Sequence, residues 1–105
     1  MHPDVYDIHF AKVKWRESES ERPWLIVGRT RDGKYYCLPI STRKYDDAGL
    51  FIDVSTDDGR ATKLTANCYV IYDVTYEIPP DKFTRPKGKL SGALLERFKR
   101  EEGYT

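Results

Sequence analysis

Residues 22–42 have the sequence RPWLIVGRTRDGKYYCLPIST, and this stretch decides the fold. Its first part, residues 24–27, is a short continuous apolar run, which is typical of a strand covered on both faces. Asp32-Gly33 follows, and this pair between two apolar segments indicates a tight hairpin turn. Residues 34–40 are rich in aromatic side chains and form the predicted return strand. Because Pro39 cannot donate a backbone hydrogen bond, we expect that strand to end or to lie at a sheet edge there.

On the N-terminal side of this hairpin, apolar residues alternate with polar ones. The alternation changes phase near Ala11, which predicts a strand with a bulge or a bend. Residues 16–21 are wholly polar and predict a loop. The residues on the first face are Tyr6, Ile8 and Phe10, and those on the second are Val13 and Trp15.

On the C-terminal side, a polar loop over residues 41–49 precedes a strand predicted at 50–54. Asp57-Asp58-Gly59 then predicts a tight turn. From Leu64 to Ile78 apolar residues of one parity alternate with mostly polar ones, which indicates one long strand, or two strands joined by a bend. Pro79-Pro80 ends this segment.

The last predicted element is an amphipathic helix over about residues 91–102. Ser91 is placed to cap its start, and Gly103 to terminate it. Leu94, Leu95 and Phe98 form one apolar stripe, so we expect this helix to cover a sheet. The pattern predicts a mostly β domain with a C-terminal helix.

Length and composition predict one domain over residues 1–105. No window approaches the ~18 apolar residues of a membrane span. The start has neither a basic region nor an apolar run, and the chain has two cysteines, so we expect a soluble cytoplasmic protein with free thiols. The net charge of +1 gives no global signature of nucleic-acid binding. Residues 81–100 nevertheless contain seven basic and two acidic side chains, which predicts either a local basic patch or a solvated helix face.

Catalysis by a bound metal or by a serine-hydrolase triad has little support in this sequence. The histidines are His2 and His9, with no spacing typical of metal ligands and no Gly-x-Ser-x-Gly motif. We therefore expect no metal and no cofactor, and we interpret His9 as a surface histidine on its strand.

Two sequence blocks resemble a known family. Residues 22–27 (Arg-Pro-Trp-Leu-Ile-Val) and 38–42 (Leu-Pro-Ile-Ser-Thr) resemble the Arg-Pro-x-Leu-Val-Ile and Pro-Ile/Val-Thr-Ser blocks of the PemK/MazF family, the toxins of bacterial toxin–antitoxin modules. Gly-Lys-Leu-Ser at 88–91, before the predicted helix, is similar to the family's closing block. The resemblance extends over roughly residues 5–101, with the blocks in the family's order.

The resemblance implies a small SH3-like barrel of the PemK/MazF/CcdB-like type over about residues 5–78, and a homodimer. It also implies a metal-independent endoribonuclease that cleaves single-stranded RNA. In that reaction the ribose 2′-hydroxyl attacks the adjacent phosphorus and leaves a 2′,3′-cyclic phosphate and a 5′-hydroxyl. The expected partners are single-stranded RNA and a small acidic antitoxin.

Residue by residue, Arg22 matches the family's catalytic arginine, and Ser41 and Thr42 fall where many members have threonine and serine. Further residues near these positions are expected to bind substrate: Arg16, Ser18, Arg43, Lys44 and Asp73, the last with its register against the family left open. Two structural interpretations stay open. Arg22 could anchor the loop through a glutamate of residues 17–21, and both hydroxyls could bond their own turn.

Hairpin geometry leads to the same site without the family. The residue before the first strand and the residue after the second lie at one end of a short-turn hairpin. We therefore expect Arg22 within reach of Ser41 and Thr42, in a site large enough for a phosphate.

Two differences between this sequence and the family's pattern support a second function class. The chain has no arginine between Arg60 and Arg85, where some members have one, and residues 17–21 are acidic for a surface that would receive RNA. The alternative is a weakened or inactive barrel of this fold that binds protein, as the related gyrase-poisoning toxins do, or nucleic acid.

Overall fold

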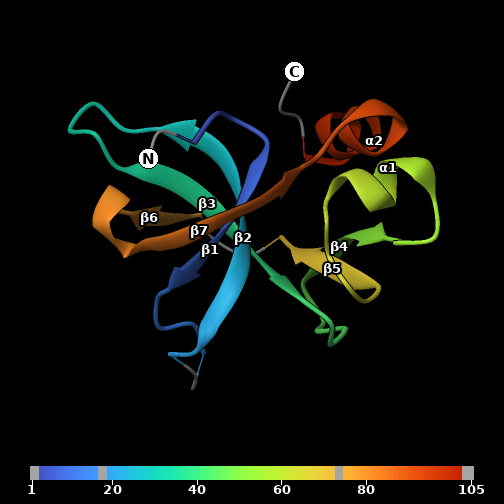
Figure 1. The fold of residues 1–105 in the computed structure, drawn as a ribbon, viewed down its shortest axis with the longest axis horizontal. Helices are drawn as coiled ribbons and strands as arrows, with labels where there is room; N and C mark the ends of the chain where they lie inside the picture. The colour runs from blue at the N-terminus through green and yellow to red at the C-terminus, as the bar shows by residue number, and fades with distance from the viewer. Residues whose placement is uncertain (1–2, 17–18, 73–74, 103–105) are drawn as a thin grey trace.

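The computed structural model describes residues 3–16, 19–72 and 75–102. These residues form a seven-stranded antiparallel sheet, and the two α-helices lie together beside its strands β4 and β5 (Figure 1). The strands are β1 (Asp7–Lys12), β2 (Glu21–Arg29), β3 (Tyr35–Ser41), β4 (Ala48–Ile52), β5 (Cys68–Ile71), β6 (Tyr76–Ile78) and β7 (Phe83–Lys89). The helices are α1 (Asp57–Ala61), the 3₁₀ turn η1 (Pro80–Lys82) and α2 (Gly92–Glu102).

The sheet has the strand order β4-β5-β3-β2-β1-β7, and β6 also pairs with β3. Among the described residues β4 and β7 are the end strands, so the sheet is not closed. The predicted class, mostly β with a C-terminal helix, is confirmed. In the described part of the chain, no helix has the length and apolar character needed to span a bilayer.

The hairpin of β2 and β3 forms the centre of the sheet, as predicted. Trp24, Leu25 and Ile26 have no exposed surface, because successive side chains enter two apolar clusters on opposite faces of β2. Gly33 has a φ of +88° in the connecting turn, a conformation that glycine adopts without strain.

The prediction for Pro39 was wrong, because β3 continues through it to Ser41. Pro39 pairs with Trp24 of β2 and is buried. On its other side β3 pairs with β6 at residues 35–37 and with β5 at residues 40–41. Pro39 lies between these two ladders, where a missing N–H donor breaks no hydrogen bond of either.

The bulge predicted in the first strand is not in β1, which ends at Lys12, before Val13 and Trp15; the irregularity lies in its partner β7. Register shifts occur between Ile8 and His9 and between Phe10 and Ala11. The pairing of β1 with β2 is regular, so the extra residues of the bulges belong to β7. The interpretation of His9 as a surface residue was wrong, since it is only 4% exposed.

The predicted tight turn at residues 57–59 is instead the first part of α1. Thr56 caps this helix, because its hydroxyl accepts the N–H of Gly59 at 3.0 Å. Asp58 also reaches the next helix and accepts the N–H of Ala93 at 2.8 Å. Among the described residues, Asp58 is therefore the side chain that accepts a hydrogen bond at the start of α2. Gly92, with a φ of +57°, has no side chain and allows Asp58 to approach closely.

The alternating segment 64–78 forms two strands, β5 and β6, rather than one. Its single-parity pattern is only partly correct, because Ala66 is exposed whereas Ile71, of the opposite parity, is fully buried. Pro79 follows the end of β6, as predicted.

Strand β7 was not predicted, because its sequence FTRPKGK is mostly polar and contains a proline. It pairs with β1 at the edge of the sheet, where proline and basic side chains are tolerated. The basic segment is therefore partly a strand rather than wholly a helix face.

The predicted apolar stripe of α2 packs onto the sheet. Phe98 has no exposed surface, and its ring meets those of Tyr6 and Tyr72 edge-on, with centroids 6.2 and 5.9 Å away. Leu94 is also buried, and Leu95 is partly buried. The predicted terminator Gly103 lies outside the described residues.

Candidate functional site

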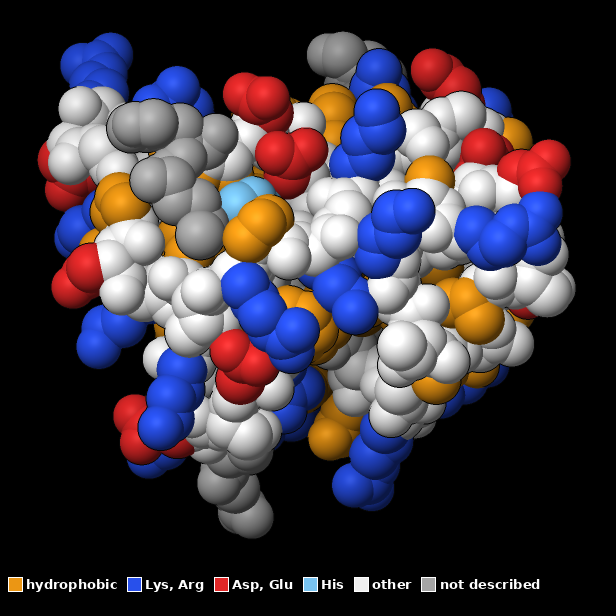
Figure 2. All heavy atoms as spheres, in the orientation of Figure 1, with side chains coloured by type: hydrophobic (Ala, Val, Ile, Leu, Met, Phe, Trp, Pro, Cys, Tyr) orange, Lys and Arg blue, Asp and Glu red, His pale blue; other side chains and the backbone are white. Residues whose placement is uncertain are grey.

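A cleft of about 330 Å³ opens where β2 begins and β3 ends. Its walls come from these two strand ends, from residues 64–68 before and at the start of β5, and from Phe10 and Lys87 of β1 and β7. Figure 2 shows Lys and Arg side chains gathered across the middle of the face on which β7 lies.

The structure places Arg22, Ser41 and Thr42 in the lining of this one cleft. The cause is the register of the central hairpin, in which Trp24 is opposite Pro39. Continued by two residues, the same register sets Arg22 opposite Ser41, where side chains of an antiparallel pair are neighbours. The hairpin therefore brings the guanidinium of Arg22 and the hydroxyls of Ser41 and Thr42 to one cleft, as its geometry led us to expect.

Arg22 is a partly buried cation that has no ion pair with any residue the structure describes. Its guanidinium carbon lies 4.6 Å from the centroid of the Trp15 ring. Its Nε is buried without a hydrogen-bond partner. Burial lowers the pKa of Arg22 below its ordinary value, and an interaction with Tyr45 opposes this shift.

The alternative interpretation was that Arg22 anchors the acidic loop through an ion pair. No such ion pair occurs among the described residues. The ion pairs within 4.0 Å in the described ranges do not include Arg22. Glu21 instead accepts hydrogen bonds from the Thr84 hydroxyl and, at 3.2 Å, from Arg85. Glu17 lies outside the described residues. A partly desolvated guanidinium with no carboxylate among the described residues is suited to bind an anion from outside.

The two hydroxyls differ in their surroundings. Ser41 Oγ accepts the backbone N–H of Arg43 at 3.1 Å, which is the turn bond of the alternative interpretation. A hydroxyl that accepts in this way keeps its own hydrogen for donation to a ligand. Thr42 is exposed at the mouth of the cleft.

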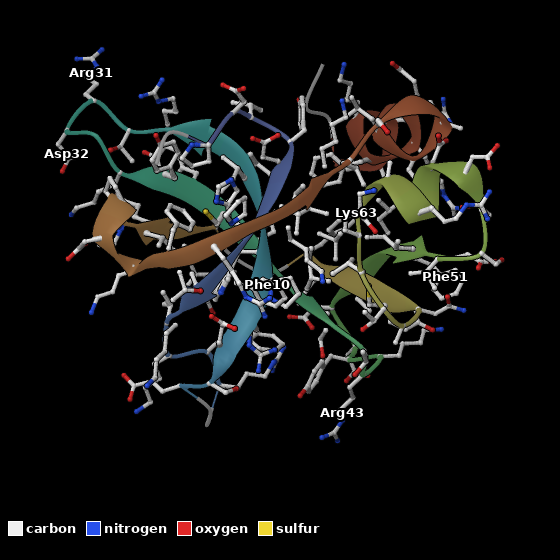
Figure 3. All side chains as sticks on the ribbon, viewed as in Figure 1. Phe10, Arg31, Asp32, Arg43, Phe51 and Lys63 are labelled. Carbon is white, nitrogen blue, oxygen red and sulfur yellow. The ribbon has the colours of Figure 1, made fainter. Side chains whose placement is uncertain are left out.

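The arginines expected to bind substrate flank the cleft without lining it. The Arg16 guanidinium lies over the rings of Trp15 and Tyr45, at 4.7 and 4.2 Å, and Arg43 lies 4.9 Å from the Tyr45 centroid. Arg16 also donates to both carboxylate oxygens of Asp47 at 3.0 Å. Arginines and aromatic rings thus alternate from Arg22 to Arg43, which lies at the edge of the view in Figure 3.

The remaining expected substrate residues are not part of this cleft. Lys44 is exposed and absent from its lining. Ser18 and Asp73 lie outside the described residues, so their placement stays a prediction.

Phe10, Glu21 and Lys87 also line the cleft, although no sequence pattern marks them as parts of a site. Glu21 directly precedes Arg22, so its position in the chain is the one local signal for it. Its hydrogen bond from Thr84, followed by smaller contributions from Arg85, lowers the pKa of Glu21, so its carboxylate is ionised at neutral pH. Lys87 belongs to the basic segment 81–100, but only the pairing of β7 with β1 brings it to the cleft.

A cation, two hydroxyls, a carboxylate and a lysine can bind and polarise a phosphate group. In the described ranges no three His, Cys, Asp or Glu side chains are grouped to hold a metal ion. Cys68 lines the cleft, but burial raises the pKa of its thiol to about 11, so it is protonated at neutral pH.

No protein-family model matches this chain, and a search of curated proteins found no match either.

Proposed function

We propose that the protein is a metal-independent endoribonuclease that cleaves single-stranded RNA in the cleft between β2 and β3. The observation that supports this most is the state of Arg22. It is a partly buried cation with no carboxylate partner in residues 3–16, 19–72 and 75–102, held on Trp15, in the same cleft as two hydroxyls. Such a group suits a phosphorane, whose oxygens gain negative charge during attack by the 2′-hydroxyl.

In this proposal the substrate supplies its own nucleophile, so the protein needs no covalent residue. Arg22 grips the phosphate oxygens, because a planar guanidinium donates two parallel hydrogen bonds. Ser41 and Thr42 donate to the same phosphate and hold it for in-line attack. Glu21 provides an ionised carboxylate that can accept the 2′-hydroxyl proton. As the bond from the 2′-oxygen to phosphorus forms, the bond from phosphorus to the 5′-oxygen breaks, and that oxygen takes up the proton that the 2′-hydroxyl gave to Glu21. The products are a 2′,3′-cyclic phosphate and a 5′-hydroxyl.

The finer fold in this proposal is an SH3-like barrel of the PemK/MazF type. The double pairing of β3 supports it, because β3 contacts β2 on one side and both β5 and β6 on the other. This arrangement divides the sheet into two lobes around one strand (Figure 1). The family resemblance also supports a homodimer, a cytoplasmic location and a small acidic antitoxin that covers the loops of the cleft.

A second candidate function is a binding module of the same fold without catalysis. The turn bond of Ser41 favours it, since this hydroxyl already has a structural role. The pairing of Glu21 with Arg85 favours it as well, because that carboxylate is a weak base while it accepts two hydrogen bonds.

The test is cleavage of mixed single-stranded RNAs in the presence of EDTA, followed by analysis of the product ends. We expect Arg22→Lys to lose most activity, because an ammonium cannot reproduce the bidentate grip. Ser41→Ala should lose less, since Thr42 can take its place. Arg31→Lys, at the tip of the β2–β3 hairpin, is the matched control and should cleave like the wild type (Figure 3).

Intact RNA after incubation with folded wild-type protein would remove the nuclease proposal. If Arg22→Ala is then equally folded and equally inactive, the binding module takes its place.

A further inference from the structure

The face of the sheet next to the cleft contains two cations on one aromatic ring. The Arg85 guanidinium carbon lies 4.1 Å from the centroid of the Phe10 ring, and Lys87 Nζ lies 5.3 Å from it. We call Phe10, Arg85 and Lys87 the β7 surface. Figure 3 shows Phe10 near the middle of the molecule, on the face that β7 crosses.

The pairing of β7 with β1 creates this surface. Arg85 is the cross-strand partner of Phe10, so their side chains are neighbours on one face of the sheet. Lys87 falls at the register shift between Pro86 and Gly88. A bulge leaves such a residue unpaired and redirects its side chain, and here Lys87 reaches the same ring as Arg85.

Both cations are accessible to an anion. The Arg85 side chain is 57% exposed and contacts Glu21 through one nitrogen at 3.2 Å. Among the described residues Lys87 has no carboxylate within 4.0 Å. Contact with the ring limits the freedom of both side chains, which lowers the entropy lost when they bind a ligand.

The β7 surface is continuous with the cleft. Phe10 and Lys87 line the cleft together with Arg22, and Arg85 lies directly beyond Phe10. A phosphate held by Arg22 would therefore have a second cationic site next to it along the same chain. Cations in a row beside an aromatic ring and a guanidinium plane are typical of surfaces that bind single strands.

We propose that the β7 surface binds the phosphodiester backbone of a single-stranded nucleic acid beside the cleft. This inference rests on the proposed binding of a single strand in the cleft, but not on cleavage. Arg85 binds a neighbouring phosphate bidentately, and Lys87 binds the chain where it enters the cleft. Glu21 competes with the strand for Arg85 and so limits its affinity.

The test measures binding by fluorescence anisotropy with a labelled 2′-O-methyl single strand of about 12 nucleotides, a length within the range of such surfaces. The 2′-O-methyl group blocks attack, so the intact wild-type site can be used. For a variant with both Arg85→Ala and Lys87→Ala we expect about tenfold weaker binding. The slope of log affinity against log salt should become shallower by about 1.4, because each lost phosphate contact contributes about 0.7.

The matched control combines Arg31→Ala and Lys34→Ala, which remove the same charge at the far tip of the β2–β3 hairpin. We expect the affinity and the salt slope of this control to equal those of the wild type. Glu21→Gln gives an independent arm that removes no basic residue. It should strengthen binding, because it releases Arg85 from its carboxylate. Thermal unfolding of each variant verifies that it is folded.

Equal loss in the β7 double variant and in the hairpin control would overturn the inference, as would unchanged affinity in both. Equally tight binding of a poly-glutamate peptide of the same charge would also overturn it, in favour of an acidic protein partner. If the wild type cleaves RNA but binding does not depend on Arg85 and Lys87, only this inference fails. If the wild type binds the strand through Arg85 and Lys87 but does not cleave RNA, only the nuclease proposal fails.

Discussion

Arg22 illustrates, at the scale of the residue, how a functional group can be stable in the fold and still unsatisfied. The Trp15 ring provides a favourable contact for its charge, whereas its buried Nε has no acceptor. An unmade hydrogen bond at a buried donor costs ~1–3 kcal/mol. Stacking on a buried ring such as that of Trp15 contributes ~2 kcal/mol, which is of the same size. The contact therefore offsets the cost of the unsatisfied Nε, which remains free to donate to a phosphate.

His9 gives a prediction on pH dependence at the same scale. Burial lowers its pKa below 6.5, and Asp7, with an oxygen 3.9 Å from Nε2, offsets this shift only in part. Between this lowered pKa and 6.5 the unfolded chain therefore binds a proton that the folded protein does not. The free energy of unfolding should fall as the pH decreases through that interval. Urea unfolding at a series of pH values measures this slope.

His9→Gln is the variant that isolates this effect, since it removes the titrating group and keeps a polar side chain. We expect a flatter dependence of stability on pH below 6.5 in this variant. Coincident slopes for His9→Gln and the wild type would show that His9 does not control the acid sensitivity.

At the scale of the element, prolines and polar residues occur where one side of a strand forms no hydrogen bonds with a neighbouring strand. Pro39 lies between the two ladders of β3, and Pro86 lies in the edge strand β7. In both strands the missing N–H leaves the neighbouring ladder intact. A proline in a strand thus marks the side that needs no donor, and it does not by itself end the strand.

Asp58 gives the prediction for an element, because it joins two helices. It belongs to the first turn of α1, and its carboxylate accepts the N–H of Ala93 at the start of α2. Loss of such a cap costs ~0.5–2 kcal/mol. We expect Asp58→Ala to lower the free energy of unfolding by about 1 kcal/mol, as measured by urea denaturation.

Asp57→Ala is the control, because Asp57 occupies the same first turn of α1. Its side chain is 92% exposed, and among the described residues it pairs with Arg60 of the same helix and with no residue of α2. Exposed pairs of this kind contribute ~0–1 kcal/mol. Equal losses in the two variants would show that the contact of Asp58 with α2 adds no stability.

At the scale of the whole molecule, oligomeric state is the property that follows from the family resemblance. We expect a homodimer, so sedimentation equilibrium at micromolar concentration should give twice the chain mass of 12.3 kDa. A species of 12.3 kDa alone at these concentrations would contradict the expectation. The result would leave the cleavage and β7-surface tests unaffected, because neither uses a residue from a second copy.

The sequence by itself determined the central hairpin and the placement of Arg22 and Ser41 in one cleft at its end. The signals for the hairpin are local: an apolar run at 24–27, a glycine turn at Gly33 and a second apolar segment after it. The signal for the helix α2 is also local, since the residues of its apolar stripe are spaced about one helical turn apart. Short-range patterns of this kind specify secondary structure wherever they agree with the packing around them.

Only the tertiary structure decided the other walls of the cleft and the state of its charges. Lys87 and Phe10 meet because β7 pairs with β1, and no periodic pattern in β7 predicts that pairing. Glu21 is engaged by Thr84 and Arg85, more than sixty residues away along the chain. His9 is buried by Phe83 of the same distant strand. Contacts between such remote residues follow from how the sheet folds, so the local sequence has no signal for them.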